Sequence, residues 1–78
     1  MTLIVENDPT SAQTLRSALG PESPVLESLD GVERHLRENE HEHVVVVGPN
    51  IGTEAAMSLA ERLRVSRPHV GVVLVRAR

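Results

Sequence analysis

Four short apolar runs recur along the chain, separated by segments of a different pattern. Val44–Val47 is apolar at every position, which is typical of a central strand in a parallel sheet because both faces of such a strand are buried. The other runs combine β-branched residues with a few polar ones and also predict strands. These further predicted strands are Thr2–Asn7, Val25–Leu29 and Val70–Ala77.

The segment Pro9–Leu19 has apolar residues at helical spacing and predicts an amphipathic helix. Asp8 is its expected N-cap, because a carboxylate there accepts hydrogen bonds from the first free backbone N–H groups, and Pro9 suits the first turn. Gly20 is the expected end of the helix. The apolar stripe consists of Ala12, Leu15, Ala18 and Leu19.

Two further helices are predicted on the same grounds. The Asp-x-x-Glu spacing of Asp30–Glu33 is a capping box, and the helix that it begins runs through Arg37. Thr53 is the expected cap of the third helix. The predicted buried stripe of that helix is Ala56, Leu59, Ala60 and Leu63. The order of elements is therefore βαβαβαβ, which favours parallel strands joined by right-handed crossovers in an α/β sheet.

The composition limits both the core and the chemistry. The 78 residues include no Phe, Tyr, Trp or Cys, so the core must be aliphatic, and no disulfide or thiol nucleophile is available. The net charge of −3 argues against a nucleic-acid partner, since phosphate binding needs clustered cations. The longest apolar run is far too short to cross a membrane and no signal peptide is evident, so we expect a cytoplasmic protein without membrane insertion.

Three stretches of the chain are similar to the receiver domain of two-component response regulators. LIVENDP at 3–9 resembles its first strand and acidic residues, and HVVVVGPNIG at 43–52 resembles its third strand and the turn that follows. LAERLRVSRPHVGVVLVRAR at 59–78 resembles its third helix and fourth strand. The resemblance implies a flavodoxin-like, three-layer parallel sheet with strand order 2-1-3-4. It also implies one domain over residues 1–78 that lacks the last part of a full receiver.

Most reactive residues of a receiver are absent when the family pattern is carried onto this chain. The acidic pair is Glu6 and Asn7, followed by Asp8, and the phosphoacceptor aspartate is replaced by Gly48. Arg76 stands where the family has a hydroxyl at the end of strand four, and the chain contains no lysine. Because magnesium needs several hard oxygen ligands, Glu6 and Asp8 alone would not hold it. The resemblance therefore implies a pseudo-receiver with no enzymatic activity, cofactor or metal.

The sequence allows two interpretations of Arg76 in this degenerate site. Its permanent positive charge could pair with Glu6 and hold the domain in one state, whereas an arginine on a last strand is more commonly solvated. Both readings remain expectations from the sequence.

The chain is most similar, within the pseudo-receivers, to one subgroup. VENDPTSAQTLRSALG, VVVVGPNIGTEAAMSLAERLRVSRP and GVVLVRAR resemble the amino-terminal domain of actinobacterial MinD/ParA-like ATPases of tight-adherence (Flp) pilus assembly. That resemblance implies positioning and self-association. No lysine-bearing nucleotide loop is present, so we do not expect this chain to hydrolyse nucleotide.

Two other segments carry polar groups that could form sites, His41–His43 and Gly48–Thr53. His41–His43 places two histidines on one side of a strand, but no third well-spaced ligand accompanies them, and we expect no metal site. Gly48–Thr53 could offer backbone amides to an anion, although turn chemistry also accounts for these residues. His35 and His69 are expected at the surface, on the second helix and in a loop.

The last strand has apolar side chains on both faces and no predicted neighbour on its outer side, so we expect either that the chain was cut from a longer protein or that another subunit completes the sheet. We expect an interface with Val70, Val72 and Leu74 on one face and Val73 and Val75 on the other, because an uncovered apolar edge favours pairing. The expected function is a non-catalytic module that binds a protein partner or self-associates, in localisation or assembly of a pilus or secretion-type system. The alternatives are a phosphorylation-dependent signalling receiver with a non-standard site, and a small-ligand or anion binder at Gly48–Thr53.

Overall fold

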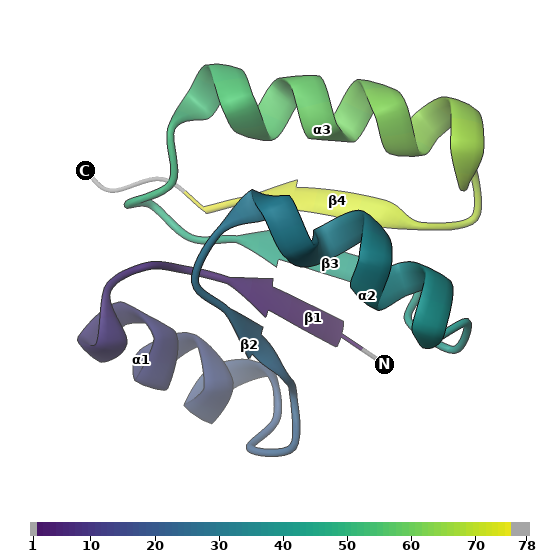
Figure 1. Ribbon diagram of the computed structural model, residues 1–78. Helices are drawn as coiled ribbons and strands as arrows, with labels where there is room; N and C mark the ends of the chain where they lie inside the picture. The colour runs from purple at the N-terminus through teal and green to yellow at the C-terminus, as the bar shows by residue number, and fades with distance from the viewer. Residues whose placement is uncertain (1, 76–78) are drawn as a thin grey trace.

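The computed structural model describes residues 2–75 as an α/β fold of three layers (Figure 1). The strands are β1 (Thr2–Val5), β2 (Val25–Leu26), β3 (Val44–Val47) and β4 (Gly71–Leu74). The helices are α1 (Pro9–Leu19), α2 (Val32–Glu38) and α3 (Thr53–Ser66), and a short 3₁₀ helix, η1 (Leu29–Gly31), precedes α2. The predicted order of strands and α-helices is confirmed.

All four strands are parallel and lie in the order β2-β1-β3-β4. The predicted fold class, a flavodoxin-like α/β sheet with this strand order, is confirmed. β3 lies mid-sheet between β1 and β4, as its continuous valine run predicted. The register pairs Val5 with Val47 and Val47 with Leu74, so β1, β3 and β4 end at the same edge of the sheet.

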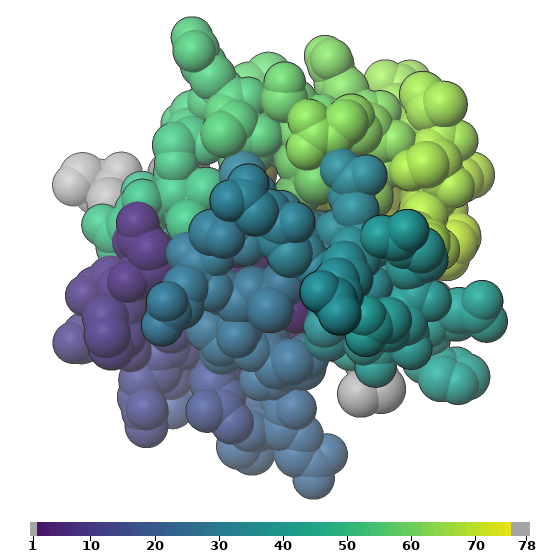
Figure 2. Space-filling model, viewed as in Figure 1, coloured from purple at the N-terminus to yellow at the C-terminus, as the bar shows by residue number. Residues whose placement is uncertain are grey.

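The main core lies on the face of the sheet that α2 and α3 cover. In the space-filling view these two helices hide most of the strands (Figure 2). Leu3, Val5, Val45 and Val47 of the strands pack there against the following helix residues: Val32, Leu36, Ala56, Leu59 and Leu63. These side chains are almost completely removed from solvent. At about 25 cal/mol per Å² of buried apolar area, this face supplies most of the hydrophobic stabilisation.

The α1 face of the sheet is covered much less completely. Ala12 is the one buried residue of α1, and Leu15 is half-buried. Leu19, at the end of the helix, keeps 45% of its surface exposed, and Val73 of β4 keeps 49%. The apolar stripe predicted for α1 is therefore only partly used, since Ala18 and Leu19 are exposed. On this face Ile4 and Val46 of the central strands are buried, whereas Val73 of β4 is not.

The ends of α1 follow the prediction closely. The Asp8 carboxylate accepts hydrogen bonds from the Ser11 N–H and hydroxyl, and Pro9 occupies the first turn. Gly20 ends the helix, and its backbone N–H donates to the carbonyl of Arg16. The φ of Gly20 is +139°, a conformation that side-chain-bearing residues rarely adopt.

The predicted starts of α2 and α3 are wrong by a short distance. Asp30 does not cap α2, because the chain enters that helix directly from η1 and Gly31 already has helical backbone angles. A capping side chain needs an extended residue at the N-cap. Gly52 has that extended conformation before α3, so Thr53 is the first helical residue of α3 instead of its cap.

The outer strands are shorter than predicted. β2 pairs with β1 only through Val25 and Leu26, and Leu29 instead belongs to η1 and packs against the core. β4 begins at Gly71, one residue after the predicted start, and Ala77 lies outside the described residues. Within residues 2–75, no helix has the length and apolarity needed to span a membrane.

Candidate functional site

The first residues after β1 and β3 meet at the carboxyl edge of the sheet. Val5 and Val47 are paired in register, so the residues that follow them, Glu6 and Gly48, lie on neighbouring strands at the same level. The N–H of Gly48 donates to the carbonyl of Val5 and fixes this juxtaposition. Ligands of doubly wound sheets bind at this edge, which makes it the candidate functional site.

Glu6 is the buried ionisable residue of this site, with 1% of its surface exposed. Its Oε1 accepts hydrogen bonds from the backbone N–H groups of Asn7 at 2.9 Å and Asp8 at 3.3 Å. Its Oε2 lies 3.5 Å from the backbone N of Asn50, in the loop after β3. Charge-assisted bonds of this kind offset the cost of removing a carboxylate from water.

Because Gly48 has no side chain, the Glu6 side chain can occupy the space beside it. A Cβ atom added to Gly48 would overlap Glu6 Oε2 and lie 2.6 Å from its Cδ. A side chain at this position would therefore require the Glu6 side chain to shift. The Glu6 carboxylate, which follows β1, fills the space into which a side chain at position 48, after β3, would project.

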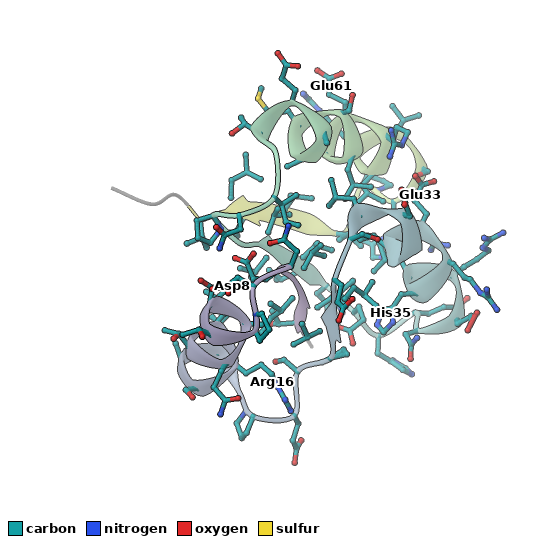
Figure 3. All side chains as sticks on the ribbon, turned by 60° about the vertical axis from the view of Figure 1, so that its left-hand side comes forward. Asp8, Arg16, Glu33, His35 and Glu61 are labelled. Carbon is teal, nitrogen blue, oxygen red and sulfur yellow. The ribbon has the colours of Figure 1, made fainter. Side chains whose placement is uncertain are left out.

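The other predicted members of the degenerate site do not converge on Glu6. Asn7 is exposed, and the Asp8 carboxylate is engaged in capping α1 (Figure 3). Arg76 lies outside the described residues, so its pairing with Glu6 stays a prediction. Between residues 2 and 75, no arginine or histidine lies within ion-pair distance of Glu6.

A cavity of about 200 Å³ opens beside Gly48, between the ends of β3 and β4 and the start of α3. The residues that line it are Val47, Gly48, Pro49, Ile51, Thr53, Ala56, Leu74 and Val75. None of these side chains is ionisable, so the part of the wall formed by residues 2–75 supplies no acid, base or charged ligand group. Its volume is below the roughly 300 Å³ at which small-molecule pockets typically begin.

The loop after β3 also bears on the predicted anion site at Gly48–Thr53. The N–H of Asn50 is directed at Glu6 Oε2, and its side-chain amide donates to the Ser11 hydroxyl at 3.4 Å. A bound anion would have to share this region with the negative charge of Glu6. The Glu6 carboxylate already occupies the position beside the Asn50 N–H at which an external anion would bind.

A second buried polar pair lies at the opposite edge of the sheet, before β3. Glu42 is 2% exposed, and its Oε1 lies 3.7 Å from Nε2 of His35 on α2. Neither His35 Nε2 nor Glu42 Oε2 has a hydrogen-bond partner among the described residues. The prediction that His35 is a surface residue is wrong, since its side chain is only 18% exposed (Figure 3).

The remaining histidines lie apart from this pair. His41 and His43 are exposed on either side of the buried Glu42, and His69 is exposed in the turn before β4, as predicted. Within the described part of the chain, no three His, Cys, Asp or Glu side chains come together as metal ligands would.

The predicted interface residues divide into core and surface. Val70 is buried at 8% exposure, and Val72 and Leu74 pack partly against the core on the α3 side. Val73 is exposed on the other face, and Val75, which follows β4, is half-buried and lines the cavity beside Gly48. Val70 therefore contributes to folding and offers no free surface.

Sequence reasoning missed the contact between Glu6 and Gly48 and the burial of Glu42. The contact between Glu6 and Gly48 could have been predicted, because two parallel strands that end together place their next residues side by side. The burial of Glu42 could not have been predicted in the same way, because the residues around it are polar and show no pattern of burial. Comparison with known proteins found no match to this chain among family descriptions, curated proteins or solved structures.

Proposed function

We propose that this chain is a non-catalytic interaction module: a pseudo-receiver that binds a protein partner or a second copy of itself. The observation that carries the proposal is the Glu6 carboxylate in the space beside Gly48. Phosphorylation at the end of the central strand needs a carboxylate there, and glycine has none. The pocket is filled from the neighbouring strand by a group that is already hydrogen-bonded.

The remaining acidic groups at this edge are committed to structure. Glu6 is buried and accepts backbone hydrogen bonds on both carboxylate oxygens. Asp8 accepts two bonds from Ser11 at the start of α1. A carboxylate that reacts with a phosphoryl donor must be accessible and must give up its own hydrogen bonds, so both residues are poor nucleophiles here.

Features of the protein surface support binding of another protein chain as the function. Among residues 2–75, β4 is an outermost strand of the sheet, and its apolar residues Val72, Val73 and Leu74 all retain exposed surface. Apolar edge strands without cover favour pairing with another chain. A role in localisation or assembly of a pilus or secretion-type system rests on the resemblance to the MinD/ParA-like proteins and extends this proposal.

The alternative is a signalling receiver that is phosphorylated at a non-standard residue. Incubation with acetyl phosphate and magnesium, followed by intact-mass measurement, distinguishes the two. We expect no gain of a phosphoryl group, and no change in the amide spectrum on addition of beryllofluoride. A mass gain that is lost in Asp8→Asn or Glu6→Gln would overturn the proposal and identify the phosphorylated residue.

Binding of an anion or small ligand at Gly48–Thr53 is the other alternative. Inorganic phosphate and sulfate serve as probes, with the melting temperature and amide chemical shifts of residues 48–53 as readouts. We expect no saturable change, because the Glu6 carboxylate is directed at the Asn50 amide. Saturable shifts confined to that loop would favour the ligand-binding function.

A further inference from the structure

The carboxyl ends of α2 and α3 lie at the edge of the sheet where the strands begin (Figure 1). Each helix carries the chain back from the end of one strand to the start of a parallel one, so both helices end at the same edge. α2 ends at Glu38, shortly before β3, and α3 ends at Ser66, shortly before β4. The last turns of the two helices therefore lie close to one another.

One turn before these ends, the two helices are joined by an ion pair. Arg62 of α3 donates from its Nε to the Glu33 carboxylate of α2 at 2.9 Å. Glu33 lies on the side of α2 that is turned toward α3 (Figure 3). This contact identifies the sides of the two helices that are turned toward each other.

The next turn of each helix places arginines on this same side. Arg37 follows Glu33 by one turn of α2, and Arg67 follows the last residue of α3, one turn after Arg62. Between the helix ends lies a cavity of about 250 Å³. The residues that line it are Glu33, Arg37, Ser66 and Arg67.

The positive charge of this cavity is not neutralised by the protein. Within residues 2–75, neither Arg37 nor Arg67 forms an ion pair, and the charge of Glu33 is balanced by Arg62. Arg67 is half-buried, so its guanidinium group has lost part of its contact with water. Two like charges at one cavity repel each other unless an anion lies between them. This occurs in a chain whose net charge is −3.

Helix dipoles account for only part of this arrangement. The carboxyl end of a helix favours a cation, but it carries only about half an elementary negative charge, whereas each guanidinium group carries a full positive one. Arg64 also lies in the last turn of α3 and does not line the cavity. The dipole therefore does not require the arginines to be directed at one cavity, and the cavity keeps an excess of positive charge.

A second hollow, of about 500 Å³, continues from the cavity along α3 and shares Glu33 and Ser66 with it. Its wall includes Val65, an apolar residue that is 85% exposed. A free inorganic anion has no apolar group to place against Val65, whereas a peptide segment does. The cavity itself is below the roughly 300 Å³ at which small-molecule pockets typically begin, so it suits one acidic side chain better than a whole ligand.

We infer that the cavity between Arg37 and Arg67 binds a carboxylate from an acidic segment of a partner protein. The guanidinium groups donate to the carboxylate oxygens, the pairing for which arginine is best suited. A neighbouring apolar residue of the segment packs against Val65. This inference rests on the proposed interaction function and specifies the chemistry of the partner.

A peptide of repeating Glu-Glu-Leu triplets with blocked ends is the probe, and the amide chemical shifts of the 78-residue chain measure its binding. We expect saturable shifts at residues 33–37 and 62–67, with an affinity that falls as salt is added, because salt screens exposed charges. The control peptide has glutamine in place of every glutamate and should give no saturable shift. Equal binding of the two peptides would overturn the inference.

Removal of single charges tests the two arginines. Arg37→Gln and Arg67→Gln should each raise the dissociation constant of the glutamate peptide about tenfold, roughly the contribution of one charge-assisted hydrogen bond. The matched control is Arg64→Gln, which removes the same charge from the last turn of α3 outside the cavity and should leave the affinity nearly unchanged. Equal losses in all three variants would indicate unspecific attraction and exclude the site.

The melting temperature separates binding from a structural role of the exposed Arg37. Without peptide, Arg37→Gln should be at least as stable as Arg64→Gln, because it relieves repulsion between like charges. Saturating glutamate peptide should raise the melting temperature of the unaltered chain and of Arg64→Gln, but hardly that of Arg37→Gln. Destabilisation of the free chain by Arg37→Gln alone, with peptide binding intact, would assign Arg37 to the fold.

Inorganic phosphate and sulfate test whether the site takes a peptide or a free anion. Both should bind more weakly than the glutamate peptide, and Val65→Ser should weaken the peptide without affecting either anion. Phosphate binding as tight as that of the peptide would overturn the inference in favour of a free anion. Absence of peptide binding also overturns it, although other contacts for the proposed function remain, whereas acquisition of a phosphoryl group overturns the proposed function.

Discussion

The Glu6 carboxylate lies against the Cα of Gly48, in the space that a side chain on Gly48 would need. The two residues are far apart in the sequence and adjacent in the sheet, since β1 and β3 end in register at Val5 and Val47. Glu6 is buried because glycine makes room for it and because backbone N–H groups solvate it. Each residue therefore constrains what the other position tolerates.

We predict that Gly48→Ala destabilises the fold by about 1–3 kcal/mol, the usual cost of overpacking a filled site. Equilibrium unfolding in urea, followed by circular dichroism, measures this change. The matched control is Gly71→Ala, where an added Cβ meets no atom within 4 Å, and its effect should be within about 0.5 kcal/mol.

The same contact predicts strong coupling between the two positions. Glu6→Ala removes the acceptor of the Asn7, Asp8 and Asn50 N–H groups and should itself be destabilising. In that background, Gly48→Ala no longer meets the glutamate and should cost much less than it does alone. Additive effects in this double-mutant cycle would contradict the steric account.

The two predicted aspartate caps should differ sharply in their contribution to stability. Asp8→Ala removes the bonds to Ser11 at the start of α1 and should lower the unfolding free energy by about 0.5–2 kcal/mol. Asp30→Ala should have little effect, because Asp30 lies in η1 and does not cap α2. Equal losses in the two variants would show that α2 is capped in solution by Asp30.

The buried His35–Glu42 pair predicts a second non-additive effect. His35→Leu removes the imidazole nitrogen that lies 3.7 Å from Oε1 of the buried Glu42 and should cost about 1–3 kcal/mol. Adding Glu42→Leu removes the buried polar group that has lost its neighbour and should recover most of that loss. The control is Arg34→Ala, which breaks an exposed pair with Glu38 and should change stability by at most about 0.5 kcal/mol.

The unequal cover of the two sheet faces predicts unequal sensitivity to truncation. Leu59→Ala removes a fully buried side chain of α3 and should cost about 2–5 kcal/mol, enough to unfold a small domain. Leu19→Ala, at the exposed end of α1, should cost well under half as much. Thermal unfolding of both variants measures the difference, and comparable losses would mean that α1 is packed more fully than its exposure indicates.

Most of the fold can be predicted from local sequence patterns. The uninterrupted valines of β3 predicted a central strand, and the Asp8–Pro9 pair predicted the start of α1 to the residue. The predictions were less accurate at α2 and β2. A capping-box pattern has no effect when the preceding residues are already helical, as Gly31 is, and a strand ends early when Leu29 gains more by entering the core.

The candidate site was only partly predictable. The loss of a carboxylate at Gly48 is visible in the sequence itself, because covalent chemistry depends on residue type alone. The placement of the Glu6 carboxylate depends on how two strands align and on which backbone N–H groups converge. Nothing in the polar segment around Glu42 indicates its burial, which results from α2 lying over the start of β3.

Periodicity, helix caps and residue chemistry act over a few positions, so the chain by itself specifies the order of its strands and helices and the reactive groups it lacks. Burial and charge environment depend instead on contacts between distant segments. Only the folded arrangement buries the Glu6 carboxyl group beside Gly48 and makes β4 an outermost strand among residues 2–75. The physical reason is that a side chain's environment is set by its neighbours in space, which local patterns do not encode.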